Sequence, residues 1–108
     1  MSVADDEGMA SLQSKASSVA KVLKLLANEK RLLVLCQLAV AGEMPVTALA
    51  SAVSLSQSAL SQHLARMREE GLVTFRRESQ TLHYSISDAQ TKQVLLALKE
   101  IYCPELAS

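Results

Sequence analysis

The chain has 108 residues, the length of one domain, and it is 49% apolar but only 3% aromatic. A core of this composition must be built from Leu, Val and Ala, which is usual for packed helices. Eleven basic and eleven acidic side chains give no net charge, so overall charge does not indicate nucleic-acid binding. No apolar run approaches the ~18 residues of a membrane span, and the N-terminus does not resemble a signal peptide. We expect a cytoplasmic protein with no membrane partner.

Residues 1–8 carry three acidic side chains and no apolar cluster. We expect them to form a disordered acidic tail before one domain over residues 9–108. From Met9 to Ala27, apolar residues recur at alternating spacings of four and three, which is typical of a helix that packs against another helix. So regular a stripe on a first helix indicates a dimer contact. Its members are Leu12, Ala16, Val19, Leu23 and Leu26.

A second helix is predicted over residues 29–41, with Asn28 as its N-cap and Gly42 ending it. This segment is nearly all apolar after its first turn, so the helix should lie at the centre of the core. Residues 43–45 are expected to form a turn. The proline that ends this turn is compatible with the start of a short helix over residues 46–53.

The next helix is the most informative part of the chain. Ser56 is a good N-cap, Gly71 suits the left-handed position after the last turn, and Leu60, Leu64 and Met67 form one buried stripe. The opposite face carries short uncharged side chains that donate and accept hydrogen bonds, which suits base edges in the DNA major groove. The expected DNA contacts on this helix are Ser56, Gln57, Ser58, Ser61, Gln62, His63 and Arg66.

A short helix, a tight turn and a helix with a polar N-terminal face form a helix-turn-helix. Residues 72–75 and 82–86 alternate in the manner of β-strands and predict a hairpin whose tip is basic. Arg76 and Arg77 fall at the predicted tip and could belong to a plain solvated turn. In winged helix-turn-helix proteins, however, the hairpin tip reaches the minor groove or phosphates. We therefore expect both arginines to contact DNA.

A last helix is predicted to begin after Ser87 or Asp88, to continue to about Tyr102 and to end before Pro104. The order of elements is helix, helix, helix, recognition helix, hairpin and helix. The predicted fold is mainly α with a β-hairpin wing, a winged helix-turn-helix with helices added at both ends.

Three segments, residues 27–32, 56–73 and 84–86, resemble ArsR-type winged-helix repressors, and the resemblance extends over nearly the whole chain from Val19 onward. It implies a homodimer built from the first and last helices. It also implies binding to an inverted-repeat operator in double-stranded DNA, and release when an inducer binds.

The familiar metal sites of the family are not matched. Pro45 and Thr47 stand where the arsenic and lead type has its thiolates, and Asp88 has no zinc-ligating partners. His63 is expected to lie beside a DNA phosphate and not to bind a metal. His83 is expected to lie on a face of a strand. No metal and no cofactor are expected. The positions where zinc partners of Asp88 would fall are Gln90, Ile101 and Pro104.

The remaining chemistry rests on Cys36 and Cys103. Cys36 alone would be an ordinary core residue. The pair resembles the thiol switch of the sulfide- and persulfide-responsive branch, in which reactive sulfur links the thiols through a disulfide or polysulfide and DNA is released. Cys103 is nearer solvent and is the better attacking thiol, although a nearby cation would be needed. Peroxide, haem or an organometal at the same cysteines stay open as inducers.

No enzyme is predicted, since the chain has no glycine-rich phosphate loop and no catalytic triad pattern. Two other functions stay open. One is a winged helix that binds a protein partner without sequence-specific DNA binding, which the uncharged Gln and Ser face opposes. The other is an antirepressor that displaces another silencer from DNA, whose DNA contacts would be the same.

Overall fold

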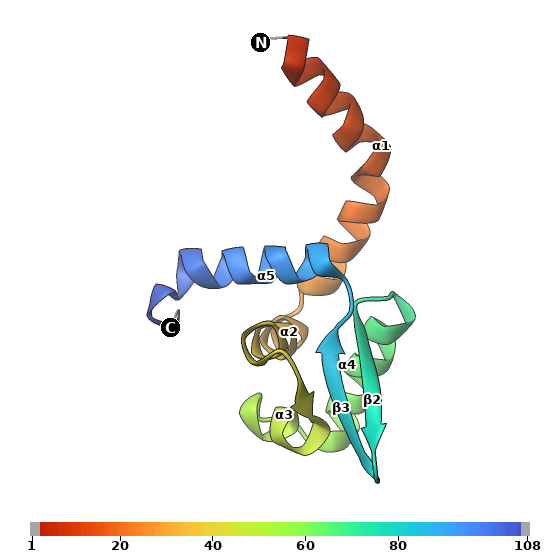
Figure 1. Cartoon of the computed structure of the whole chain (residues 1–108), viewed down its shortest axis with the longest axis vertical. Helices are drawn as coiled ribbons and strands as arrows, with labels where there is room; N and C mark the ends of the chain where they lie inside the picture. Colours follow the sequence, from red (N-terminus) through yellow and green to blue (C-terminus); the bar gives the residue numbers. More distant parts are fainter. Residues whose placement is uncertain (1–2, 107–108) are drawn as a thin grey trace.

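The computed structural model describes residues 3–106. It has five helices and a three-stranded antiparallel sheet, so the predicted winged helix-turn-helix is confirmed (Figure 1). The elements are α1 (Val3–Leu26), α2 (Glu29–Ala41), β1 (Met44–Pro45), α3 (Val46–Ala52), α4 (Gln57–Glu69), β2 (Val73–Glu78), β3 (Thr81–Ile86), α5 (Ala89–Tyr102) and a 3-10 turn (Pro104–Leu106). No helix within residues 3–106 combines the length and hydropathy needed to cross a membrane.

Helix α1 begins earlier than expected. The segment 1–8 was predicted to be disordered, but the helix extends back to Val3, and only residues 1 and 2 of that segment lie outside the described part. Asp6 and Glu7 lie near the N-terminus of this helix, where negative charge interacts favourably with the helix dipole. The N-terminal half of α1 projects away from the rest of the protomer (Figure 1).

The predicted starts of α2, α4 and α5 are set by local capping. In each of α2, α4 and α5, a side-chain oxygen accepts a hydrogen bond from the backbone N–H three residues ahead, at 3.1 Å. The capping residues are Asn28, Ser56 and Asp88. Gly42 and Gly71 follow α2 and α4 with φ of 87° and 79°, the left-handed backbone that glycine adopts at little cost.

The segment 43–45 is not only a turn. Met44 and Pro45 form strand β1, which pairs antiparallel with β3 opposite Tyr84 and His83. The strand order is therefore β1-β3-β2. A two-residue strand has no periodicity of its own, so the sequence around it gave no signal for this pairing.

The wing is longer than predicted. Strand β2 continues to Glu78, so Arg76 and Arg77 lie within the strand, opposite His83 and Leu82. The tip is the Ser79–Gln80 loop, where Ser79 adopts a left-handed backbone (φ 60°). Such a two-residue loop lets the ladder extend almost to the end of the hairpin.

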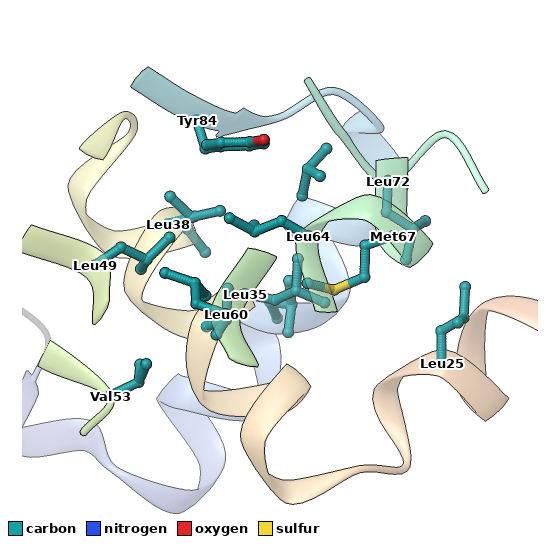
Figure 2. Packing of buried hydrophobic residues seen from close by; sticks show 14 of the residues in the cluster. Leu25, Leu35, Leu38, Leu49, Val53, Leu60, Leu64, Met67, Leu72 and Tyr84 are labelled. Atoms are coloured by element: carbon teal, nitrogen blue, oxygen red, sulfur yellow. The ribbon is translucent and has the colours of Figure 1, made fainter. Parts of the chain in front are cut away.

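The core lies between α2, α4 and the sheet, and Figure 2 shows how its leucines interdigitate. Leu35 of α2, Leu49 of α3, Leu60 of α4 and Leu95 of α5 are completely buried. The predicted central position of α2 is thus observed. This packing fixes which face of α4 points outward.

Candidate DNA-binding face and dithiol groove

The outward face of α4 carries most of the side chains that the sequence predicted to contact DNA. Leu60, Leu64 and Met67 are at most 1% exposed, so the opposite side of the helix is turned to solvent. His63 is half-buried at the edge of that side. The exposed side chains from the predicted set are Gln57, Ser58, Ser61, Gln62 and Arg66.

Ser56 has a structural role besides any contact with DNA. Its hydroxyl oxygen accepts a hydrogen bond from the Ala59 N–H at 3.1 Å and caps α4. The hydroxyl proton can still be donated to a phosphate oxygen. Ser56 can therefore hold the start of the recognition helix and contact the DNA backbone at the same time.

The two wing arginines, predicted as equivalent, are in different environments. The Nε and Nη2 atoms of Arg76 lie 2.8–3.1 Å from the Glu43 carboxylate, and its Nη1 lies 2.7 Å from Glu78 Oε2. The hydrogen bonds from Arg76 hold the pKa of both carboxyls below the usual range, so the cluster is ionised at neutral pH. Arg76 thus joins the wing to the residue that precedes β1.

Arg77 lies on the other face of β2, since successive side chains of a strand point to opposite sides. It is exposed, and within residues 3–106 it forms no ion pair. Its positive charge is therefore available to phosphate oxygens, unlike that of Arg76.

Arg68 was not expected from the sequence to have a role. Its guanidinium lies over the Phe75 ring, 4.4 Å from the centroid. Phe75 in turn meets Tyr84 across the strands, with ring centroids 5.4 Å apart. These contacts fix the C-terminal end of α4 against the wing, so α4 and the wing keep one relative orientation.

Cys36 and Cys103 lie on one groove between α2 and α5. Both are half-buried free thiols, and the groove has a volume of about 440 Å³. The structure thus brings together two residues that are far apart in the sequence. The other residues lining the groove are Leu32, Leu33, Gln37, Val40, Leu98, Lys99 and Tyr102.

The two thiols differ in environment. Burial raises the pKa of the Cys36 thiol above its ordinary value, and a negative charge on Cys103 raises it further. Cys36 is therefore a neutral thiol at physiological pH and a poor first nucleophile. Cys103 follows the last turn of α5, where its N–H donates to the Lys99 carbonyl oxygen at 2.7 Å. Lys99 lines the same groove and is a candidate for the cation that a thiolate at this helix end would need.

The apolar stripe predicted on α1 is largely unburied. Of its members, Leu26 is in the core, but Leu12, Val19 and Leu23 are 52%, 42% and 51% exposed. Helix α5 likewise exposes apolar side chains at its C-terminal end and along one side. The exposed large apolar residues of the two helices are Met9, Leu12, Val19, Leu23, Val94, Ile101 and Tyr102.

Comparison with known proteins agrees with this geometry. Residues 28–74, from the α2 cap into β2, match the family described as "Bacterial regulatory protein, arsR family". The HTH-type transcriptional regulator YgaV of Escherichia coli is 42% identical over 96 residues, which cover 89% of this chain and 97% of that protein. The chain belongs to the ArsR family of bacterial regulatory proteins.

Other relatives match this chain well beyond residues 28–74. The transcriptional activator HlyU of Vibrio cholerae is 42% identical over 92 residues, covering 85% of this chain and 84% of HlyU. The crystal structure of the transcriptional repressor BigR from Xylella fastidiosa superposes with a TM-score of 0.81 at 35% identity, covering 88% of this chain and 96% of BigR. A homodimeric winged helix-turn-helix DNA-binding domain from Mycobacterium bovis gives a TM-score of 0.72 at 31% identity, covering 87% and 86%. The chain is thus a DNA-binding transcriptional regulator.

Proposed function

We propose that this ArsR-family protein is a homodimeric repressor that leaves its operator when Cys36 and Cys103 of one subunit are linked by reactive sulfur or by oxidation. The observation that supports the switch is the position of both thiols on one groove between α2 and α5. A covalent link between the two thiols would join α2, which packs in the core, to α5, which has an exposed apolar surface.

Two surfaces support the DNA-binding dimer. The exposed apolar residues of α1 and α5 are suited to pairing with the same helices of a second copy. A two-fold axis would then place two α4 helices on successive half-sites, about 10–10.5 bp apart, of an inverted repeat. The uncharged outward face of α4 would read base edges, and Arg77 would contact the backbone.

The proposed sulfur chemistry begins at Cys103, because Cys36 stays protonated. The Cys103 thiolate attacks the outer sulfur of a persulfide R–S–SH, forms Cys103–S–SH and releases R–SH. Cys36 then attacks the Cys103 Sγ, and its proton leaves with the displaced sulfur as H₂S. In total, the two cysteine thiols are oxidised to a disulfide. The outer sulfur of the persulfide is reduced to H₂S.

A longer link follows if both thiols are converted to persulfides. The terminal sulfur of one persulfide attacks the Sγ of the other, which gives a trisulfide and H₂S. A direct disulfide requires Cα atoms at about 4.4–6.8 Å, so an inserted sulfur relaxes that requirement.

The link can act through the packing of α2. Leu35 and Leu38 of this helix are buried in the same core cluster as Leu49 and Leu60 of the helix-turn-helix, and α5 also packs on α2. A covalent tie between α2 and α5 would change the spacing of the two α4 helices in a dimer. Allosteric coupling of about 1–3 kcal/mol changes affinity by roughly 5- to 150-fold, which is enough to empty an operator.

The test measures operator binding by fluorescence anisotropy before and after treatment with glutathione persulfide, with hydrogen peroxide in a parallel arm. The Cys36→Ser and Cys103→Ser variants are expected to bind DNA as the wild type does and to lose the response. Mass spectrometry should show an intramolecular link in the wild type alone. A Cys36→Ser protein released like the wild type would contradict the paired mechanism.

A further inference from the structure

The walls of the dithiol groove are mostly apolar. Leu32, Leu33, Val40, Leu98 and Tyr102 line it, and of the other side chains besides the two thiols only Lys99 is charged. Its volume of about 440 Å³ lies within the ~300–1,000 Å³ range of pockets that bind small organic molecules. An inorganic sulfide or polysulfide would need far less space, and the leucines and Val40 that form most of the wall give it no hydrogen-bond partner.

Two of these side chains, both on α2, are unusually open to solvent for their size. Leu33 and Val40 are 43% and 54% exposed. A carbon chain lying along the groove would cover them and would itself leave water. Each methylene group that becomes buried raises the binding constant about two- to fourfold, and the larger value applies to full burial.

We propose, on the basis of the dithiol switch above, that the inducer is an organic persulfide whose R group is an apolar carbon chain. The chain lies against the α2 and α5 leucines and Val40, and this contact holds the outer sulfur of R–S–SH at Cys103. Attack by the Cys103 thiolate then breaks the S–S bond of the inducer and forms Cys103–S–SH. The thiolate R–S⁻ leaves beside the Lys99 ammonium and takes a proton from water.

The order of the two thiols fits this arrangement. Cys36 lies on the same groove and is the less reactive thiol at neutral pH, so it reacts after Cys103 has been converted. The departing R–SH must vacate the groove before Cys36 reaches Cys103 Sγ. An apolar group therefore accelerates the first step and has no part in the link that follows.

The experiment uses full-length Cys36→Ser protein, in which Cys103 is the single cysteine, and alkyl methanethiosulfonates as probes. The Cys103 thiolate displaces methanesulfinate and forms Cys103–S–S–R, which mass spectrometry follows in time. Each rate is divided by the rate of the same probe with N-acetylcysteine amide, which removes intrinsic reactivity. From methyl to butyl, the normalised rate should rise by about 8- to 60-fold, the product of three methylene groups. The anionic sulfonatoethyl and cationic trimethylammonioethyl probes should both be slower than butyl.

Wall variants provide the matched control. Val40→Gln, made in the Cys36→Ser protein, should flatten the alkyl series, whereas Ala41→Gln, which changes an exposed neighbour on the last turn of α2, should leave it unchanged. A flat series in the Cys36→Ser protein, or equal rates for the charged probes and butyl, would overturn the proposal.

Failure of this inference is distinguishable from failure of the switch itself. Sodium tetrasulfide, an inorganic donor, is added to wild-type protein on operator DNA. Release by tetrasulfide together with a flat alkyl series keeps the switch and removes the apolar inducer. A steep alkyl series at Cys103 in a protein that no persulfide releases from DNA supports the groove and removes the switch.

Discussion

The contrast between Arg76 and Arg77 gives the sharpest prediction about DNA binding. Both are exposed residues of β2, yet Arg76 is held by Glu43 and Glu78 while Arg77 forms no ion pair within residues 3–106. Arg77→Gln should therefore remove one phosphate contact from each wing. Arg76→Gln should remove none and should act through the position of the wing.

The expected magnitude follows from counterion release. Each phosphate contact contributes about −0.9 to the slope of log K against log[salt]. Two wings in a dimer give a change of about 1.8 for Arg77→Gln. Between 50 and 200 mM salt, the ratio of wild-type to variant affinity should therefore fall by roughly 12-fold, which is 4 raised to the power 1.8.

The assay is anisotropy titration of operator and scrambled duplexes at four salt concentrations. Arg77→Gln should weaken both duplexes equally. Combining Glu43→Gln with Glu78→Gln should do the opposite, because Arg76 is then released towards phosphates and the salt slope steepens. Equal slope changes for Arg76→Gln and Arg77→Gln would refute the assignment of Arg76 to wing positioning.

Four further predictions concern other parts of the molecule. Gln57→Ala and Gln62→Ala should lower the ratio of operator to scrambled affinity by about 1–3 kcal/mol per bidentate contact, and an unchanged ratio would mean that α4 does not read bases. Replacing Leu12 and Leu23 with glutamate should give monomers in analytical ultracentrifugation; a persisting dimer would place the interface elsewhere. In Cys103→Ser protein, Cys36 should react with iodoacetamide more slowly than a free thiol at pH 8 and should accelerate above pH 9, because burial raises its pKa; a rate matching the free thiol would contradict its assignment as the second nucleophile. Elemental analysis of protein purified without chelator should find well under one zinc per subunit, and a stoichiometric metal that changes DNA affinity would contradict a metal-independent switch.

The sequence alone determined the elements whose stability is local. Asn28, Ser56 and Asp88 cap helices through hydrogen bonds to the backbone three residues ahead, so a short stretch of sequence contains all the atoms involved. The same holds for the buried stripe of α4, whose spacing also fixes which side chains face outward. The helix-turn-helix and its exposed polar face were predictable for this reason.

The start of α1 was not predictable in the same way. Residues 3–8 do not continue the apolar stripe of helical spacing, so the pattern indicated a tail, yet the helix continues through them. Extending an existing helix adds one hydrogen bond per residue without a new nucleation cost. Apolar periodicity therefore placed the first residue of α1 too far along the chain.

Only the tertiary structure decided the contacts between distant segments. The pairing of β1 with β3 places Glu43 beside Arg76, 33 positions away, and the packing of α2 on α5 places Lys99 on the groove of Cys36 and Cys103. Such contacts depend on the relative position of whole elements, which many weak packing interactions set together. Residue type and spacing predicted which groups had useful chemistry, and the packing of the core determined which of them meet.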